Sequence, residues 1–170
     1  MTLDRRSFIK VLGSASGLAL AGCASQGSVG STTEIMPKGA ARRVVVVGGG
    51  FGGAIAAKYV RMLDKSIEVV LIEQNRQFIS CPFSNFYIAG LMNDMSTLTI
   101  GYDKLAANHG IKMVYGVATA IDPAAKKVVT TEGTLTYDRL IVSPGIDFRN
   151  EEIEGYTADS ANTIPHAWKA

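Results

Sequence analysis

The sequence predicts an α/β fold built on a parallel sheet, with an antiparallel β-meander inserted into it and an export signal in front of it. Two observations indicate the parallel sheet. Four valines at residues 44–47 run directly into a cluster of glycines, and a second strand-like segment at residues 66–73 ends in an acidic residue. The third observation concerns the meander: after residue 110, short β-segments separated by turn residues replace the alternation of strand and helix.

The glycines at residues 48–53, "GGGFGG", follow a strand of the kind that is buried on both faces. Gly48, Gly50 and Gly53 fit the pattern G-x-G-x-x-G. In that pattern the first glycine allows a tight turn, the second lets the backbone approach a pyrophosphate, and the third lets the following helix pack closely on the strand. The stretch therefore predicts a phosphate-binding loop of the Rossmann type.

The segments after the glycines agree with this prediction. Residues 54–63 carry apolar side chains at helical spacing, and a helix that begins there presents its N–H groups and its dipole to a phosphate. The next strand, residues 66–73, ends at Glu73, which lies 20 residues after Gly53 (73 − 53) and can accept hydrogen bonds from a ribose diol. No Gly-Lys-Ser/Thr follows the loop, which excludes phosphate-loop nucleotide hydrolysis. We therefore expect dinucleotide binding.

The second half of the chain has a different pattern. A short helix is expected at residues 102–108, closed by Gly110, and a strand at residues 111–116. Residues 117–145 then predict three short β-segments with turns at Asp122-Pro123 and Glu132-Gly133. The last of these, "YDRLIVSPG", predicts a buried strand that runs into Pro144-Gly145. A meander inserted into a doubly wound domain is typical of flavoproteins with two dinucleotide domains.

The first 25 residues predict an export signal of the twin-arginine type. "DRRSFIK" at residues 4–10 places two arginines before an apolar pair and a lysine, and a weakly hydrophobic run follows at residues 11–24. A transmembrane helix is the alternative, but this run has about 14 residues, whereas a span needs roughly 20. Substrates of the twin-arginine translocase cross the membrane already folded. We therefore expect a periplasmic protein that takes up its cofactor in the cytoplasm.

Within this run, "LAGC" at residues 20–23 resembles the lipobox at which bacterial lipoproteins are cleaved and acylated. Cys23 is then either acylated or discarded with the signal peptide. Small residues are common before a cysteine in Ala/Gly-rich signals, which slightly favours the second interpretation.

Composition and the two ends of the chain suggest its organisation. The formal net charge is +2, and part of the positive charge lies in the signal, so we expect no nucleic-acid partner. The last residues, "TIPHAWKA", contain no helix cap or closing strand, which predicts that the domain continues beyond them. The predicted organisation is a signal peptide at 1–25, a flexible Ser/Thr/Gly-rich linker at 26–41, the N-terminal segment of the dinucleotide-binding domain at 42–150, and the start of a connection to the remainder at 151–170.

From Arg42 onward, the sequence resembles the flavoprotein subunits of flavocytochrome c sulfide dehydrogenases. The resemblance rests on "VVVVGGGFGGAIAAKYV", "SIEVVLIE", "CPFSNFYIAG", "YDRLIVSPGI", and "IEGY" running on to "PHAWKA". Sulfide:quinone reductases and type II NADH dehydrogenases are more distantly similar. They share the glycine loop and the "YDRLIVSPG" element but do not typically share "PHAWKA".

The resemblance implies that the cofactor is FAD. Glycines of the loop would line its pyrophosphate, the acid after the second strand would hold the adenosine ribose, one backbone position would touch adenine, and a Pro-Gly pair would close over the dinucleotide. These residues are Gly48, Gly50, Gly52, Gly53, Glu73, Ala118, Pro144 and Gly145. For Ala118 an ordinary place in a strand is an almost equally good interpretation, and Gly145 could serve a turn alone.

Cys81 lies in "FISCPFSNF", a stretch that is predicted to be a loop. At this position the resembled family attaches FAD covalently, through a thioether from the cysteine sulfur to a methyl group on the benzenoid ring of the flavin. The alternatives are an inert buried thiol and half of a disulfide. A disulfide has no obvious local partner, because the other cysteine, Cys23, belongs to the predicted signal. An exported thiol with no role would be at risk of oxidation. Pro82 and Phe83 follow the cysteine where relatives carry other residues, so attachment needs its own test.

The resemblance also implies a reaction. A small inorganic sulfur compound such as sulfide would be oxidised at a redox-active cysteine pair beside the flavin, and electrons would pass to a c-type cytochrome subunit. We expect that pair downstream of residue 170, so no catalytic residue and no metal ligand is predicted here, and these residues alone are expected to be inactive. Two alternatives remain: a flavoprotein like sulfide:quinone reductases or NADH dehydrogenases, and a flavin-binding protein without turnover of its own.

Overall fold

The computed structural model describes residues 33–147, 149–157, 159–160 and 163. The predicted signal peptide, Cys23 and "PHAWKA" lie outside these residues. In chain order, the helices and strands are β1 (Arg43–Val47), α2 (Phe51–Leu63), β2 (Glu68–Glu73), β3 (Gln77–Ile79), α3 (Ser84–Ile88), η1 (Ser96–Leu98), β4 (Thr99–Gly101), α4 (Asp103–His109), β5 (Lys112–Tyr115), β6 (Ala118–Asp122), β7 (Lys127–Thr130), β8 (Gly133–Thr136), β9 (Arg139–Val142) and η2 (Asn150–Glu152).

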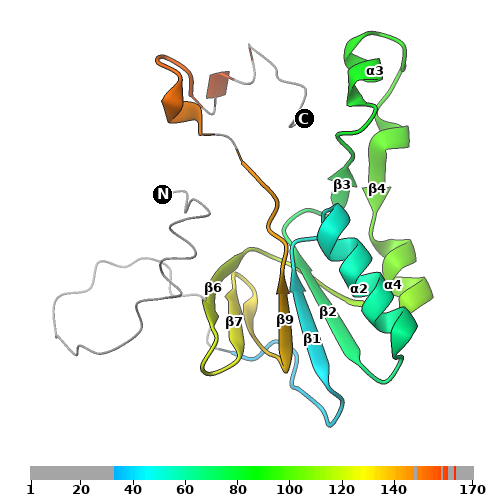
Figure 1. The fold of residues 1–170 in the computed structure, drawn as a ribbon, viewed down its shortest axis with the longest axis vertical. Helices are drawn as coiled ribbons and strands as arrows, with labels where there is room; N and C mark the ends of the chain where they lie inside the picture. The colour runs from blue at the N-terminus through cyan, green and yellow to red at the C-terminus, as the bar shows by residue number, and fades with distance from the viewer. Residues whose placement is uncertain (1–32, 148, 158, 161–162, 164–170) are drawn as a thin grey trace, which may run out of the picture.

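A parallel sheet of four strands, in the order β5-β2-β1-β9, is the centre of the fold (Figure 1). β1 pairs with β2 from Arg43 opposite Glu68, and with β9 from Val44 opposite Arg139. All five residues of β1 are buried, as its unbroken apolar run predicts for a central strand with both faces covered. The predicted α/β fold with a parallel sheet and an inserted antiparallel sheet is confirmed.

The valines of β1 divide between two hydrophobic cores because successive side chains of a strand point to opposite faces. Val44 and Val46 pack with Ala57 of α2, with residues of β2, and with the residues just before and after α4, which are Tyr102 and Ile111. Val45 and Val47 pack on the other face, in a cluster that includes Val128, Leu135 and Tyr137 of the meander region. The sheet is therefore sandwiched between the helices α2 and α4 and the three-stranded meander.

The helix after the glycine loop begins earlier than its apolar spacing predicts. α2 starts at Phe51 with Gly50 as its N-cap, so that Gly52 and Gly53 form its first turn. α4 is shifted by one residue from the predicted helix, and it ends at Gly110, whose φ of 62° is the left-handed conformation expected of a glycine after a helix. No helix within the described ranges combines the length and the hydrophobicity that a membrane span requires.

The meander differs from the prediction in its last segment. β6, β7 and β8 form the antiparallel sheet, with a register shift between Ala118 and Ala120. The stretch "YDRLIVSPG" does not complete this sheet but contributes β9, which returns to pair in parallel with β1. β9 was predicted to be buried, yet Val142 at its end is 45% exposed, because β9 is the edge strand of the parallel sheet.

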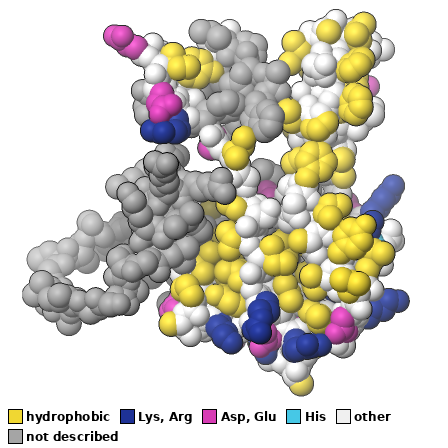
Figure 2. Space-filling model, viewed as in Figure 1, with side chains coloured by type: hydrophobic (Ala, Val, Ile, Leu, Met, Phe, Trp, Pro, Cys, Tyr) yellow, Lys and Arg dark blue, Asp and Glu magenta, His cyan; other side chains and the backbone are white. Residues whose placement is uncertain are grey.

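Between β2 and α4 the chain leaves the sheet as an arm, residues 77–101, of which the sequence predicted residues 78–86 as a loop. β3 and β4 pair antiparallel as the stem of the arm, and α3 lies at its tip (Figure 1). Figure 2 shows hydrophobic side chains gathered along this arm. The large ones that are exposed are Ile79, Phe83, Phe86, Tyr87, Ile88, Leu91 and Ile100.

The described part of the predicted flexible linker, residues 33–41, makes contacts with the meander. Ile35 N–H donates to Thr134 O at 3.1 Å, and Thr134 N–H donates to Thr33 O at 2.8 Å. Gly133 makes this close crossing possible, because a Cβ on it would lie 2.5 Å from Thr33 O. Ile35 and Met36 also pack against the core under the meander. Ile35 and Met36 are apolar residues within this polar stretch, and their partial burial against the core accounts for these contacts.

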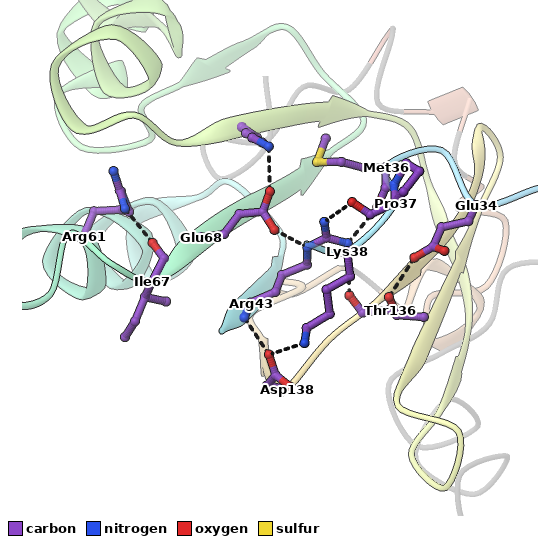
Figure 3. A network of polar contacts seen from close by, with 11 residues as sticks. Glu34, Met36, Pro37, Lys38, Arg43, Arg61, Ile67, Glu68, Thr136 and Asp138 are labelled. Carbon is purple, nitrogen blue, oxygen red and sulfur yellow. Dashed lines mark hydrogen bonds and ion pairs between the residues drawn. The ribbon is translucent and has the colours of Figure 1, made fainter. Parts of the chain in front are cut away.

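Arg43, the first residue of β1, is buried and holds this N-terminal segment against the sheet (Figure 3). Its guanidinium donates to Glu68 Oε2 at 2.5 Å, to Met36 O at 2.8 Å and to Pro37 O at 3.1 Å. The Arg43 N–H donates to Asp138 Oδ2 at 2.6 Å. A buried guanidinium is tolerated only when its charge and its donors are satisfied in this way.

Glu68 completes the network by accepting from Lys112 Nζ at 2.6 Å as well as from Arg43. Burial raises the pKa of Glu68, but the hydrogen bonds and positive charges of Arg43 and Lys112 outweigh burial, so its pKa lies below the ordinary value. Glu68 therefore stays ionised at neutral pH. The network joins the amino ends of β1, β2 and β5 and does not reach their carboxyl ends.

We predict that Arg43→Met lowers the free energy of unfolding by about 3 kcal/mol or more, because it removes the buried partner of the Glu68 carboxylate, which keeps Lys112, and leaves the carbonyls of Met36 and Pro37 without their donor. Urea unfolding measures this change. Arg42→Met is the matched control: Arg42 pairs with Asp64 at 3.0 Å, but its side chain is 70% exposed, so the urea midpoint should hardly move. Equal shifts in the two variants would contradict the structural role of Arg43.

Candidate functional site

The carboxyl ends of the parallel strands meet at one edge of the sheet, where β1 runs into the glycine loop, β2 ends at Glu73, and β9 leads to Ser143. In open α/β sheets, ligands bind outside the carboxyl ends of the strands, at the point where neighbouring connections diverge. β1 is such a point, since β2 lies on one side of it and β9 on the other. The candidate site is therefore the space in front of residues 48–53.

Gly48 and Gly53 are required by close packing within the loop. Gly48 has a φ of 95°, and a Cβ on it would lie 2.0 Å from Ser143 O at the end of β9. A Cβ on Gly53 would lie 1.8 Å from Gly48 O. The first glycine lets β9 pass close to the turn, and the third lets α2 start directly over it, as the sequence pattern predicts.

Gly50 and Gly52 have different surroundings. A Cβ on Gly50 would meet no atom closer than Phe78 Cε2 at 3.8 Å, so this glycine is not required by packing. A Cβ on Gly52 would lie 2.8 Å from Ser143 Oγ. The open space at Gly50, at the N-cap of the 13-residue helix α2, is where the predicted approach of a pyrophosphate has room.

Glu73 contacts the glycine loop. Its Oε2 accepts from the Gly49 N–H at 2.7 Å, and its Oε1 accepts from the Asn75 N–H at 2.9 Å. The carboxylate thus stabilises the turn after β1 as well as the start of the next loop. Each carboxylate oxygen has further lone pairs, so the predicted hydrogen bonds to a ribose diol remain compatible with these two contacts.

Tyr102 contacts the same turn from the other side. Its hydroxyl donates to Gly49 O at 3.0 Å, and its ring is buried with 4% of its surface exposed. Burial first, and the neighbouring Glu73 and Tyr115 next, raise the pKa of Tyr102 to about 12, so the phenol is protonated at neutral pH. The sequence placed Tyr102 only at the start of a helix and did not associate it with the loop.

Cys81 follows β3, just beyond the stem of the arm. Its carbonyl accepts from the Ser84 N–H at 2.9 Å, and its side chain is partly buried. Phe78, three residues earlier, packs edge-on against Phe51 of α2 with ring centroids 5.0 Å apart. Three residues span about 10 Å at most along the backbone, so the Cα of Cys81 lies within that distance of the Cα of Phe78, whose ring borders Gly50. Among the described residues, Cys81 takes part in no disulfide.

The remaining predicted residues are Pro144, Gly145 and Ala118. Pro144 and Gly145 follow Ser143 directly, and Gly145 has a φ of 80° with no atom within 4 Å of the position of a Cβ. Ala118 begins β6 at the register shift of the meander, partly buried against the core. The structure thus brings Gly48, Glu73 and Ser143 into one cluster, whereas no described contact joins Ala118 to the loop.

A family model for the pyridine nucleotide-disulphide oxidoreductases matches residues 42–169. The chain belongs to this family. Its members are flavin-dependent oxidoreductases that bind FAD, in agreement with a glycine loop, an acid at the end of β2 and an inserted meander.

Individual relatives support this assignment. A sulfide dehydrogenase [flavocytochrome c] flavoprotein chain from Chlorobaculum thiosulfatiphilum is 66% identical over 44 residues, which are 26% of this chain and 92% of that sequence. The type II NADH:quinone oxidoreductase NdhA of Mycobacterium tuberculosis is 28% identical over 81% of this chain and 30% of its own length. The solved sulfide:quinone oxidoreductase of Aquifex aeolicus has a TM-score of 0.58 and 29% identity, covering 62% of this chain and 24% of that one.

Within the described residues of this pyridine nucleotide-disulphide oxidoreductase chain, neither a surface hollow nor the acidic groups form a second site. A hollow of about 340 Å³ lies at the amino edge of the sheet, beside Arg61, Glu68 and Lys112. Its basic groups are already engaged, because Arg61 donates to the carbonyls of Lys65 and Ile67 and Lys112 donates to Glu68. Within the described part of the chain, no group of three or more His, Cys, Asp or Glu residues could hold a metal ion.

Proposed function

We propose that this chain binds FAD in an oxidoreductase that oxidises sulfide, or a related reduced sulfur compound, and delivers the electrons to a c-type cytochrome subunit. The observation that carries the proposal is the 66% identity to a sulfide dehydrogenase flavoprotein chain over 44 residues. At the identities seen in other members of the family, about 30%, substrates differ widely, whereas the higher value favours a shared one. A redox-active cysteine pair, expected downstream of residue 170, would act beside the flavin.

The residues of this chain would hold and orient the cofactor. The space at Gly50 and the N–H groups at the start of α2 suit the pyrophosphate, and Glu73 suits the adenosine ribose. Pro144 and Gly145 would close over the dinucleotide. Bound FAD would supply a two-electron acceptor for sulfide and a one-electron donor for the cytochrome.

A second candidate is transfer of electrons from sulfide to a quinone. The observation that favours it is the similarity to the sulfide:quinone oxidoreductase of Aquifex aeolicus, with a TM-score of 0.58. The two candidates share the electron donor and differ in the acceptor. The third candidate is a flavin-binding protein without turnover, whose flavin would not be reduced by any of these electron donors.

The function is tested by following the flavin absorbance of the purified protein under anaerobic conditions. Sulfide should bleach the oxidised flavin band, and oxidised c-type cytochrome should then restore it. Restoration by a short-chain quinone but not by cytochrome would favour the second candidate. Bleaching by NADH and not by sulfide would refute both, and an unchanged spectrum with either donor would favour a protein without turnover.

We also propose that Cys81 carries the flavin through a thioether. The step requires a thiolate close to the benzenoid ring of the oxidised flavin: the methyl group would lose a proton, the sulfur would bond to its carbon, and the flavin would take up the electron pair and pass it on to the cytochrome acceptor. The stem of the arm, which leads to Cys81, borders the glycine loop through Phe78. The pyrophosphate would be bound at Gly50 and the ring system would extend from there toward the arm. Cys81 is partly exposed, which is compatible with a reactive rather than an inert thiol.

If Cys81 is the attachment point, the flavin should stay with the polypeptide after acid precipitation, because a thioether survives conditions that release non-covalent contacts. Cys81→Ser should still bind FAD through the loop but release it to the supernatant, since a hydroxyl is a far poorer nucleophile than a thiolate at neutral pH. Cys23→Ser is the matched control and should keep the flavin attached. A tryptic peptide of unmodified mass spanning Cys81, with all flavin recovered free, would sink the proposal.

The location of this reaction is a further part of the proposal. We infer export to the periplasm by the twin-arginine translocase, from the "DRRSFIK" stretch and the weakly hydrophobic run after it. Cys23 would be removed with the signal or, as the alternative, acylated. Periplasmic c-type cytochromes would then be accessible as electron acceptors.

Replacing Arg5 and Arg6 together by lysine should leave the protein in the cytoplasm, because lysine keeps the charge but does not reproduce the paired guanidinium groups. Cell fractionation measures the distribution. Arg42→Lys makes the same change outside the signal and should leave export intact. An unchanged periplasmic yield in the double variant would remove the twin-arginine assignment.

A further inference from the structure

The peptide groups on both sides of Gly49 are held by side chains from two separate elements. Its N–H donates to Glu73 Oε2 at 2.7 Å, and its carbonyl accepts from Tyr102 Oη at 3.0 Å. Only glycine fits between these partners, since a Cβ on Gly49 would lie 2.7 Å from Tyr102 Oη. Gly49 is the second residue of the loop and is not one of the three glycines of the G-x-G-x-x-G pattern.

The hydrogen bond from Tyr102 determines the direction of the next N–H group. A trans peptide is planar, and its C=O and N–H point in opposite directions. No described residue follows a cis peptide bond. With the Gly49 carbonyl directed at the buried Tyr102 hydroxyl, the N–H of Gly50 is directed away from it. Gly50 is the N-cap of α2. The space around it is open, because the nearest atom to a Cβ on Gly50 would be 3.8 Å away.

Tyr102 is suited to hold this carbonyl permanently. Its ring lies in the core with Val46, Leu71 and Ala57, so the hydroxyl has little freedom to turn away. Burial, followed by Glu73 and Tyr115, raises its pKa to about 12, so it remains a donor throughout the physiological pH range. The ring of Tyr115 lies 6.5 Å away, between centroids.

We propose that Tyr102 is a positioning residue for dinucleotide binding: by fixing the Gly49 carbonyl, it presents the Gly50 N–H to the diphosphate of the cofactor. This inference rests on the proposed binding of FAD. Tyr102 itself touches no part of the dinucleotide and acts through the backbone of the loop. Without its hydroxyl, the peptide between Gly49 and Gly50 can rotate, because glycine accepts many backbone conformations. Binding would then have to order the loop, which lowers affinity.

The test compares Tyr102→Phe with Tyr137→Phe, each made in a Cys81→Ser background so that the cofactor can be removed and added back. Tyr137 is the control because its ring is also buried, at 8% exposure, but lies in the core on the opposite face of the sheet. Dissociation constants for FAD and for ADP are measured by titration of the apoprotein. ADP carries the diphosphate without the flavin. Urea unfolding of each apoprotein gives its stability.

Tyr102→Phe should weaken binding of both FAD and ADP by about five- to tenfold, because binding must then order the loop and restore what one buried hydrogen bond had held, while Tyr137→Phe leaves both unchanged. The urea midpoint of each apoprotein shows whether the variant is still folded under the titration conditions, which separates positioning from general destabilisation. Gly49→Ala should weaken ADP binding as well, because the added methyl group would displace the Tyr102 hydroxyl from the Gly49 carbonyl.

Two results with Tyr102→Phe would overturn the inference and leave the proposed function intact: binding of both ligands within twofold of a parent that binds them, or a loss for FAD without a loss for ADP. A parent protein that binds neither FAD nor ADP would overturn the inference together with the proposed function. An equal loss of binding in Tyr137→Phe would assign the effect to stability and would also overturn it.

Discussion

The close approach of three backbone segments at the carboxyl edge of the sheet is the constraint on which the rest of the site depends. The turn after β1, the start of α2 and the end of β9 come so near that a single Cβ on Gly48 or Gly53 would overlap a carbonyl oxygen. This packing directs the N-terminus of α2 toward the space in front of the loop. It also brings Ser143 beside Gly48, and with it the Pro144-Gly145 pair that follows.

The amino ends and the carboxyl ends of the parallel strands have different roles. At the amino edge, the buried Arg43 joins β1 to Glu68 of β2 and to the segment that precedes the sheet. These contacts satisfy a buried charge and contribute to stability, but they lie at the far end of each strand from the loop. At the carboxyl edge, Glu73 and Tyr102 hold Gly49 instead. Stability and binding can therefore be altered by separate substitutions.

The arm connects the candidate site to the rest of the proposed reaction. Its stem borders the loop through Phe78, and Cys81 lies just beyond the stem, so a dinucleotide that extends from Gly50 toward the arm would bring its flavin near the thiol. Belonging to the pyridine nucleotide-disulphide oxidoreductases makes FAD the expected cofactor but does not select an electron donor. The choice of sulfide depends on one short stretch of high identity.

Local pattern in the sequence was enough to predict the buried strand of valines, the turn at Gly48, the helix after it, Glu73 at the end of the next strand and Gly110 after α4. Each of these depends on a residue and its near neighbours along the chain. The tertiary structure alone decided that β9 leaves the meander to pair with β1, that residues 33–35 lie alongside β8, and that Tyr102 holds the loop. The physical reason is distance along the chain: the hydroxyl of Tyr102 meets a carbonyl 53 residues away, and such a contact leaves no periodicity or spacing in the sequence from which it could be predicted.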